Sequence, residues 1–466
     1  MDGVKKNEIY ELTITDLNNL GYGVGRIGDL VTFVSGAVDG DRVTVKIIKI
    51  AKNYAVGRLE KILSPSPHRL PTPDPCPARG CGGCAYRAIT YAHELELKRG
   101  SVLAAFRRAG LPDAQVAPVL ATGKTAGYRN KAQYPVTGSC DEPVIGFFAP
   151  KSHRVTDARK CPLQPPLFGE ILDGIAEQIK KYRIAPYDEE THTGLLRHIY
   201  LRASKDEKEV LLTFVLNGDS LPHADEVVRE LTDRFPALVG IGINVNREKT
   251  NVICGDEYKT LWGKDGITDA LAGVELSFSA ASFYQVNRDA AELLYNKAKE
   301  IADFNGNETL LDLFCGVGSI GLSMADAVRE VIGIEIVPDA VRCANENAKR
   351  NGIKNAVFFA GDATDTEKLL AGAESELGKE LRPDAVVLDP PRKGCDEKLL
   401  SFLANRGIPK IVYISCNPET LARDVAFLAK RGYEFSTITP VDLFPRTAHV
   451  ESVCRLIRQR SSPDGE

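Results

Sequence analysis

The alternation of apolar and polar residues changes its period along the chain. Residues 7–64 carry short runs that alternate with period two, namely EIYELTITDL, VTFVSG, DRVTVKIIKI and YAVGRLEKIL, and these runs predict the strands of a small β-barrel. We expect the GYGVG sequence at residues 21–25 to be a turn and not a dinucleotide-binding loop, because no long helix follows it. The sequence SPSPHRLPTPDP at residues 64–75 predicts a proline-rich linker.

Beyond the linker the pattern becomes mixed and then helical. A helix is expected at Tyr91–Ala109, and residues from about 115 to 280 alternate strand-like runs such as HIYLRAS and EVLLTFVLNG with turn residues. The stretch VNRDAAELLYNKAKEIADF predicts a long helix, and units of strand, glycine turn and helix follow it. The pattern therefore predicts an α/β protein of three domains: a small β-barrel at 1–66, a central α+β domain at 67–280 and a Rossmann-like domain at 281–460.

Composition adds limits to this picture. A chain of 466 residues with 43% hydrophobic and 26% charged residues is typical of a globular protein with more than one core. No apolar run could cross a bilayer and the first residues carry no signal peptide, so we expect a cytoplasmic protein with no membrane partner. The formal net charge of −4 argues against indiscriminate polyanion binding. Eleven cysteines without an export signal favour thiol or metal chemistry over disulfides.

Acidic residues follow three successive predicted strands of the C-terminal domain. The sequence TLLDLFCGVGSIGLSMA at residues 309–325 predicts a strand, a glycine turn that lets the backbone approach a ligand, and a helix. Glu335, Asp362 and Asp389 end or follow the next three strands. Each acid alone could be a helix cap or a loop residue, but three in register predict one crevice at the carboxyl edge of a parallel sheet. The turn lacks both the third glycine of the nicotinamide fingerprint and the P-loop GK[ST], so an adenosine-containing ligand without a pyrophosphate fits better.

Several motifs together resemble one enzyme family. DLFCGVGSIGL, LDPPRKG, ISCNPETLARD, SFYQVN at 282–287 and HVESV at 449–453 are similar to those of the RNA uracil-C5 methyltransferases, which use S-adenosylmethionine. The resemblance implies a class I methyltransferase domain. It also implies that the residues in contact with the cofactor or beside it are Gln285, Phe314, Ser319, Glu335, Asp362 and Asp389. Relatives usually carry asparagine where this chain has Ser319.

Cys416 lies between an apolar strand and the first turn of a predicted helix. Asn417 can cap that helix and Pro418 suits its first turn, so the positive end of the helix dipole should favour the nucleophilic thiolate of Cys416. The family resemblance implies that this sulfur adds to C6 of uracil, which makes C5 able to accept a methyl group. It also implies that Glu451, alone among apolar neighbours in HVESVCRLI, removes the C5 proton with a pKa raised by burial. Inert packing for Cys416 and a solvent-facing strand position for Glu451 are the alternatives.

A cysteine cluster follows the linker. Cys76, Cys81 and Cys84 have four and two residues between them, and Cys161 supplies a fourth thiolate. Four thiolates suit zinc or an iron–sulfur cluster, and the spacing alone does not choose. Resemblance to a bacterial branch of the family with a four-cysteine site implies a structural [4Fe–4S] cluster. A radical enzyme that uses S-adenosylmethionine is the rival, but its usual motif has three residues between the first two cysteines and leaves one iron open.

RNA is the predicted partner. A target base must leave its stack before sulfur can approach C6, so a flipped-out loop uridine is the expected substrate. The barrel resembles the TRAM domain, an OB-like RNA-binding module. The candidate RNA contacts are Lys46, Lys49, Lys52, Arg58 and Lys61 for phosphates, Tyr22 or Tyr54 for stacking, and Arg129, Lys131, Arg197 and His198 in the middle domain. A solvated barrel surface and structural pairing are the alternatives for these residues.

The RNA itself is chosen by resemblance. An iron–sulfur site together with an N-terminal barrel looks most like the 23S ribosomal RNA enzymes, and methylation of the transfer RNA T-loop is the alternative. An adenine amino-methyltransferase is a further rival, but Arg392 stands where those enzymes carry an aromatic residue. A non-catalytic RNA-binding or ribosome assembly factor is the last, and the presence of both Cys416 and Glu451 argues against it. No obligate protein partner is evident.

Overall fold

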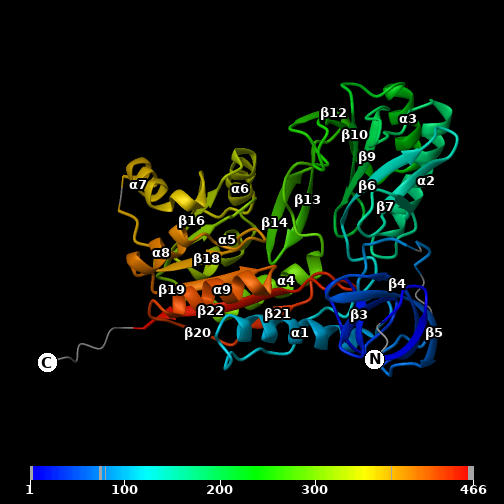
Figure 1. Ribbon diagram of the computed structural model, residues 1–466. Coiled ribbons are helices and arrows are strands. Elements are labelled where there is room, and N and C mark those ends of the chain that lie inside the picture. Colours follow the sequence, from blue (N-terminus) through cyan, green and yellow to red (C-terminus); the bar gives the residue numbers. More distant parts are fainter. Residues whose placement is uncertain (1–3, 73–75, 79, 379, 460–466) are drawn as a thin grey trace.

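The computed structural model describes residues 4–72, 76–78, 80–378 and 380–459. Figure 1 shows three parts: a barrel beside the N-terminus, a central sheet above it, and a larger sheet covered by helices that carries the C-terminus. The predicted linker runs out of the barrel, and its residues 73–75 lie outside the described part. No helix of the described residues is both long and apolar enough to cross a membrane.

The N-terminal part is a closed barrel with strand order β1-β2-β3-β5-β4. Its strands are β1 (Ile9–Leu17), β2 (Tyr22–Ile27), β3 (Leu30–Ser35), β4 (Arg42–Ile50) and β5 (Tyr54–Ser64). The four expected strands are confirmed, but the turn expected at residues 21–25 is wrong, because most of that stretch forms β2. Its glycines let β2 pass close to β1: a Cβ on Gly25 would lie 2.6 Å from the carbonyl oxygen of Thr13. A side chain at that position would push the two strands apart.

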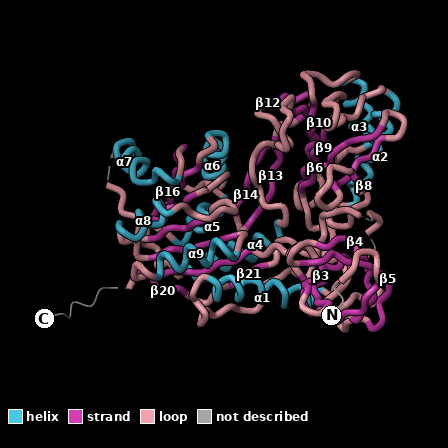
Figure 2. The backbone as a smooth tube through the Cα atoms, viewed as in Figure 1, coloured by secondary structure: helices cyan, strands magenta, loops and turns pink. Residues whose placement is uncertain are grey.

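The central part is a seven-stranded sheet with two helices packed on one face (Figure 2). Its elements are β6 (Lys131–Gly138), β7 (Pro143–Phe148), β8 (Val155–Asp157), α2 (Pro166–Lys181), β9 (Leu196–Ala203), β10 (Val210–Leu216), α3 (Ala224–Arg234), β11 (Leu238–Val245) and β12 (Glu257–Gly263). The strand order is β12-β11-β10-β9-β6-β7-β8. The central strands β9 and β10 are buried along their whole length, which explains their nearly continuous apolar sequences.

The C-terminal part is an eight-stranded sheet of order β17-β16-β15-β18-β19-β22-β20 with β21 paired to β22. Its strands are β15 (Thr309–Leu313), β16 (Glu330–Glu335), β17 (Ala356–Ala360), β18 (Ala385–Leu388), β19 (Lys410–Ser415), β20 (Tyr433–Phe435), β21 (Thr439–Val441) and β22 (Glu451–Arg458). Its helices are α4 (Arg288–Ala302), α5 (Ser319–Met324), α6 (Pro338–Arg350), α7 (Thr366–Leu377), α8 (Glu397–Arg406) and α9 (Pro418–Ala429), with short 3-10 turns at Ala325–Ala327 and Ala363–Asp365. Strands β15 to β19 are parallel, as a Rossmann-like domain requires, and β22 runs antiparallel to β19.

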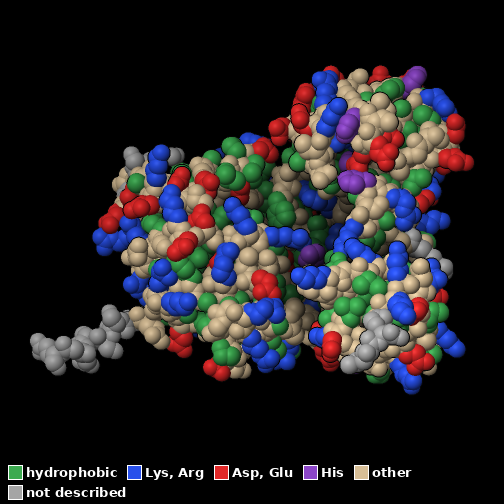
Figure 3. Space-filling model, in the orientation of Figure 1, with side chains coloured by type: hydrophobic (Ala, Val, Ile, Leu, Met, Phe, Trp, Pro, Cys, Tyr) green, Lys and Arg blue, Asp and Glu red, His purple; other side chains and the backbone are tan. Residues whose placement is uncertain are grey.

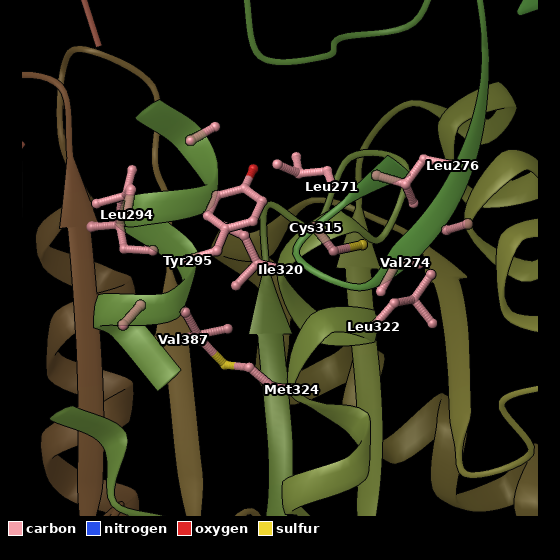
Figure 4. Close-up of a cluster of buried hydrophobic side chains, with 14 of the residues drawn as sticks. Leu271, Val274, Leu276, Leu294, Tyr295, Cys315, Ile320, Leu322, Met324 and Val387 are labelled. Atoms are coloured by element: carbon pink, nitrogen blue, oxygen red, sulfur yellow. The ribbon is translucent and has the colours of Figure 1, made fainter. Parts of the chain in front are cut away.

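Two segments from earlier in the chain pack on this C-terminal sheet. Helix α1 (Tyr91–Arg108) lies along α9, and Val116 and Leu120 form bridges to Ile438 and Val441. The hairpin β13 (Gly266–Leu271) and β14 (Val274–Ser279) shares a core with α4 and α5, where Figure 4 shows Leu276 and Tyr295. The core of the C-terminal part therefore includes residues on the far side of the predicted boundary at 280.

Candidate active site and cysteine cluster

The glycine turn after β15 is tied to the end of β16. Phe314 adopts a positive φ of 66°, and Glu335 at the end of β16 accepts a hydrogen bond from the Gly316 amide at 3.0 Å. The other oxygen of the same carboxylate accepts the Val337 amide at 2.9 Å. The turn, Glu335, Asp362 and Asp389 lie at the carboxyl ends of the adjacent strands β15, β16, β17 and β18, so the structure brings these residues to one edge of the sheet, where the sequence predicts a crevice.

The other predicted crevice residues have local partners. Asp362 is exposed and accepts a hydrogen bond from the Thr364 amide at 2.8 Å, so it caps a short helix, which was the alternative role for each of these acids. The Ser319 hydroxyl lies 3.1 Å from the buried hydroxyl of Tyr295. Gln285 is buried, and its backbone carbonyl accepts a hydrogen bond from the Asn130 side chain at 3.0 Å. The crevice thus draws on the central part of the chain as well as on the parallel sheet.

Asp312 is a crevice residue that sequence reasoning missed. It is buried in β15, and one of its oxygens accepts the Gly321 amide at 2.8 Å while the other has no partner among the described residues. Burial raises its pKa to about 8, and the neighbouring Asp389 and Glu335 add to the shift. The signal in the sequence was an acid in the middle of the apolar run TLLDL. A buried carboxyl at this point fixes the helix that follows the glycine turn.

Cys416 lies at the predicted junction of β19 and α9. Asn417 caps the helix by accepting the Glu419 amide at 3.1 Å, and its side-chain amide donates to the Arg392 carbonyl at 3.0 Å. The expected thiolate is wrong, however, because burial raises the pKa of Cys416 to about 11, and the Glu451 and Asp389 carboxyls raise it further than Arg392 lowers it. Burial and the two nearby carboxyls therefore favour the thiol over the thiolate that the helix end alone predicts.

Glu451 lies across the sheet from Cys416. Strands β19 and β22 pair antiparallel with Ser415 opposite Ser452, so Cys416, one residue beyond β19, lies at the same end of the pair as Glu451, the first residue of β22. Glu451 is 5% exposed and is not the solvent-facing residue of the alternative. Burial raises its pKa to about 8, with Asp389 raising it and Arg392 lowering it. The pKa of Asp389 is itself raised to about 7 by burial. The structure therefore brings a thiol, two carboxyls of raised pKa and one arginine together.

Cys416 opens on a cavity of about 1070 Å³ where the three parts of the molecule meet. Its walls come from the barrel at Asn19–Tyr22, from the segment beside Cys84, from α1 and from the residues before Glu451. Figure 3 shows a hollow between the parts, with Lys and Arg side chains along its rim. Close approach of the barrel is possible because Gly21, with a φ of 74°, lies so near Ala85 that a Cβ would fall 1.9 Å from its carbonyl oxygen. The cavity is large enough for a nucleotide that has left its stack.

The four predicted cluster cysteines are neighbours. Burial raises the pKa of Cys84 to about 12, and Cys161, Cys81 and Cys76 each add to the shift. Cys161 is raised to about 11 by burial and by Cys76 and Cys81. Four neighbouring thiols are ligands that suit either zinc or an iron–sulfur cluster.

A second group of possible ligands joins the barrel to α1. Among the described residues, Asp39, His68 and His93 have ligand atoms within 4.8 Å of one another. The two imidazoles stack with their centres 3.7 Å apart and their planes at 11°, so their lone pairs lie side by side and do not converge on one point. His93 bonds instead to Asp39 at 2.7 Å and to Glu96 at 3.1 Å. This group is a polar contact between the barrel and α1.

The candidate RNA residues divide into exposed and buried sets. Lys49, Lys52, Arg58 and Lys61 are exposed on the barrel, Lys46 is half-buried, and Tyr22 lines the cavity beside Cys416.

Two candidates of the central sheet are buried. Arg197 donates to the carbonyls of Asn246 at 2.9 Å and Glu248 at 2.7 Å, and its guanidinium lies over the ring of Tyr187. His198 is also buried, and burial lowers its pKa to about 4. Structural pairing is therefore the role that the geometry favours for Arg197.

Comparisons with known proteins agree with this arrangement. Residues 259–459 match the family model described as tRNA (Uracil-5-)-methyltransferase, and residues 3–59 match the TRAM domain model. A Clostridium tetani protein named an uncharacterized RNA methyltransferase is 39% identical over 450 residues, which cover 97% of this chain and 96% of that protein. A similarly named Halalkalibacterium halodurans protein is 38% identical over 455 residues and covers 97% and 98%.

A solved structure also matches over the whole chain. It is the Pyrococcus abyssi tRNA (uracil-54, C5)-methyltransferase in complex with S-adenosyl-L-homocysteine, which is 28% identical and superposes with a TM-score of 0.76. The match covers 96% of this chain and 99% of that one. The barrel, the central sheet and the C-terminal sheet all therefore have counterparts in one known structure.

The raised pKa of Glu451 has a consequence for stability. Its pKa is about 8 when folded against an ordinary value of 4.5, so between these pH values the folded state keeps a proton that the unfolded state releases, and stability falls as the pH rises. Glu451→Gln should therefore match the wild-type Tm at pH 4.5 and exceed it by a few degrees at pH 9. Glu434→Gln, at an exposed position of β20, is the matched control for calorimetry at both pH values. A Glu451→Gln difference that does not change with pH would contradict the assignment.

Proposed function

The chain belongs to the TRAM-containing RNA uracil-5-methyltransferase family, and from this premise we propose that it methylates C5 of a specific uridine in 23S ribosomal RNA. The observation that carries the proposal is the meeting of Cys416 and Glu451 at one end of the β19–β22 pair, beside the carboxyl edge of the parallel sheet and open to a cavity. S-adenosylmethionine supplies the methyl group. The product is 5-methyluridine.

The crevice residues fit that methyl donor. We assign the ribose hydroxyls to Glu335, whose carboxylate already braces the glycine turn, and the cofactor's other contacts to the remaining crevice residues. These are Gln285, Phe314, Ser319, Asp362 and Asp389. Ile336 and Val337, directly after Glu335, are 61% and 50% exposed and offer an apolar surface for a planar base. An exposed pair of apolar side chains beside an acid at the end of a strand is typical of a nucleoside-binding site.

Cys416 begins the reaction. Its sulfur bonds to C6 of the flipped-out uracil, and the thiol proton passes to Asp389, the other carboxyl beside Cys416, which leaves Glu451 free for the later step. Electron density that the addition leaves at C5 then takes the methyl group.

Glu451 completes the reaction. Its carboxylate takes the proton from C5, the electrons of that C–H bond restore the C5–C6 double bond, and the C6–sulfur bond breaks to return the sulfur to Cys416. A pKa of about 8 suits this task, since a carboxylate of ordinary acidity would be a weak base toward carbon.

We further propose that Cys76, Cys81, Cys84 and Cys161 hold a [4Fe–4S] cluster with a structural role. The support is their mutual proximity, and the choice of an iron–sulfur cluster over zinc follows the resemblance to the branch of the family with a four-cysteine site. The cluster would supply a fixed crosslink between the segment after the linker and the strand region after β8. The 23S target rests on the combination of this site with the barrel; the tRNA T-loop is the second candidate, because a tRNA enzyme superposes over the whole chain.

RNA that contains 5-fluorouridine tests the covalent step. Fluorine at C5 cannot leave as a proton, so the wild type should form a methylated adduct with the RNA that survives denaturing electrophoresis. Cys416→Ala should form none, and Cys140→Ala, at a half-buried free cysteine in the β6–β7 turn, should form as much as the wild type. If the wild type bound this RNA but formed no covalent adduct with it, the mechanism would be contradicted.

The RNA target is tested by mapping 5-methyluridine in a strain that lacks the gene. One 23S site should lose its methyl group while the transfer RNA T-loop keeps its own, and the gene returned on a plasmid should restore the site. Loss from transfer RNA alone would replace our choice by the second candidate.

The cluster is tested by metal content after anaerobic purification. We expect about four iron atoms per chain and a broad absorbance near roughly 400 nm, both lost in Cys161→Ser and kept in Cys140→Ser. One zinc per chain without that absorbance would contradict the proposed cluster.

A further inference from the structure

Lys98 is a lysine in α1 whose charge is completely withdrawn from solvent. Its ammonium donates to the Glu94 carboxylate at 2.7 Å, to Asp442 at 2.6 Å and to the carbonyl of Phe444 at 3.1 Å. The side chains of Lys98, Glu94 and Asp442 are all 0% exposed. A buried charge of this kind is costly unless its partners are fixed, so the three groups lock α1 to residues 442–444.

Those residues begin a loop that ends at Glu451. We call residues 442–450 the base loop; it leaves β21 after Val441 and enters β22 at Glu451, and Val441 and Glu451 are paired across the two strands. Asp442 therefore directly follows the strand partner of Glu451. Thr447 to Val450, the last residues of the loop, form part of the wall of the Cys416 cavity.

The same part of α1 makes two further hydrogen bonds to the base loop. Glu94 also accepts the backbone amide of Arg446 at 2.7 Å, and Tyr91 donates its hydroxyl to Asp442 at 2.7 Å. Arg446 has a φ of 70°, a left-handed conformation that the Glu94 bond helps to keep. The loop is thus bonded to α1 at its start, Asp442, and at its bend, Arg446, and Lys98 connects the two carboxylates that take part in these bonds.

From this geometry we infer that Lys98 is a positioning residue for the base of the reaction, acting through the base loop on Glu451. The inference rests on the proposed function, since it assigns Glu451 a step of that reaction. Cys416 is held by different elements, β19 and the cap of α9, so Lys98 should govern proton removal from C5 and leave the addition of sulfur to C6 unchanged. A lysine that only compensated buried charge would affect both steps alike.

Lys98→Met removes the charge and keeps most of the volume. On a uridine transcript of whichever RNA the wild type modifies, we expect kcat to fall roughly 10- to 100-fold, because small displacements of a catalytic group have effects of that size. The adduct should form on the 5-fluorouridine transcript within about threefold of the wild-type rate, since that product needs no proton removal. Enzyme covalently bound to the ordinary transcript should accumulate during turnover.

Two further variants keep the test decisive. Glu94→Gln/Lys98→Met leaves only one buried carboxylate without its cation and should show the same kinetic pattern, even where the single variant folds poorly. Lys410→Met is the matched control: Lys410 starts β19, donates to the Asp303 carbonyl at 2.8 Å, and lies at the opposite end of that strand from Cys416.

The outcomes are separable. An equal fall in both rates for the folded double variant, or normal turnover of Lys98→Met, overturns the inference. Absence of any adduct with the wild type would instead overturn the proposed function.

Discussion

The arrangement depends on one antiparallel strand pair in a sheet that is otherwise parallel through β19. In a parallel sheet every strand presents its carboxyl end to the same edge, which gathers the glycine turn, Glu335 and Asp389. Because β22 runs the other way, its first residue and not its last reaches that edge. The pairing of Ser415 with Ser452 thereby brings residues from two distant motifs, ISCNPETLARD and HVESV, to the same place. A one-residue slip of β22 would turn Glu451 to the other face of the sheet.

Burial and charge then set the chemistry. Asp312 and Glu451 are buried and Asp389 is half-buried, the pKa values of these carboxyls are raised to about 8, 8 and 7, and the same environment favours the thiol form of Cys416. Such a group of acids costs stability at neutral pH, since each would be ionised in the unfolded chain. In the proposed mechanism the same burial makes Asp389 able to accept a proton from sulfur and makes Glu451 basic enough to take a proton from carbon. Arg392, which is exposed beside them, lowers the pKa of Glu451 and so limits its rise.

Much of the fold and part of the candidate site can be predicted from the sequence, for physical reasons that differ from one element to the next. Runs of period two predict four of the barrel strands, and helical periodicity predicts α1 and α4. The acids at the ends of successive strands predict the edge of the sheet where they meet. These signals are local in the sequence. The strand at Tyr22–Ile27 was missed since its glycines look like a turn until β1 is seen beside it. The protonated state of Cys416 was also missed: a helix dipole can be inferred from Asn417 and Pro418, but the carboxyls that oppose it come from other strands. The attachment of α1 to the base loop joins Lys98 to Asp442, which are 344 residues apart in the chain, so no local pattern in the sequence predicts it.

The account is tested most directly by RNA that carries tritium at C5 of uridine, because methyl transfer and proton removal can then be counted separately. The wild type should release one tritium for each methyl group transferred. Glu451→Gln should incorporate methyl into a protein-bound RNA without releasing tritium, and Cys416→Ala should do neither. Methyl transfer with tritium release by the Cys416→Ala enzyme would contradict the covalent mechanism on which the account depends.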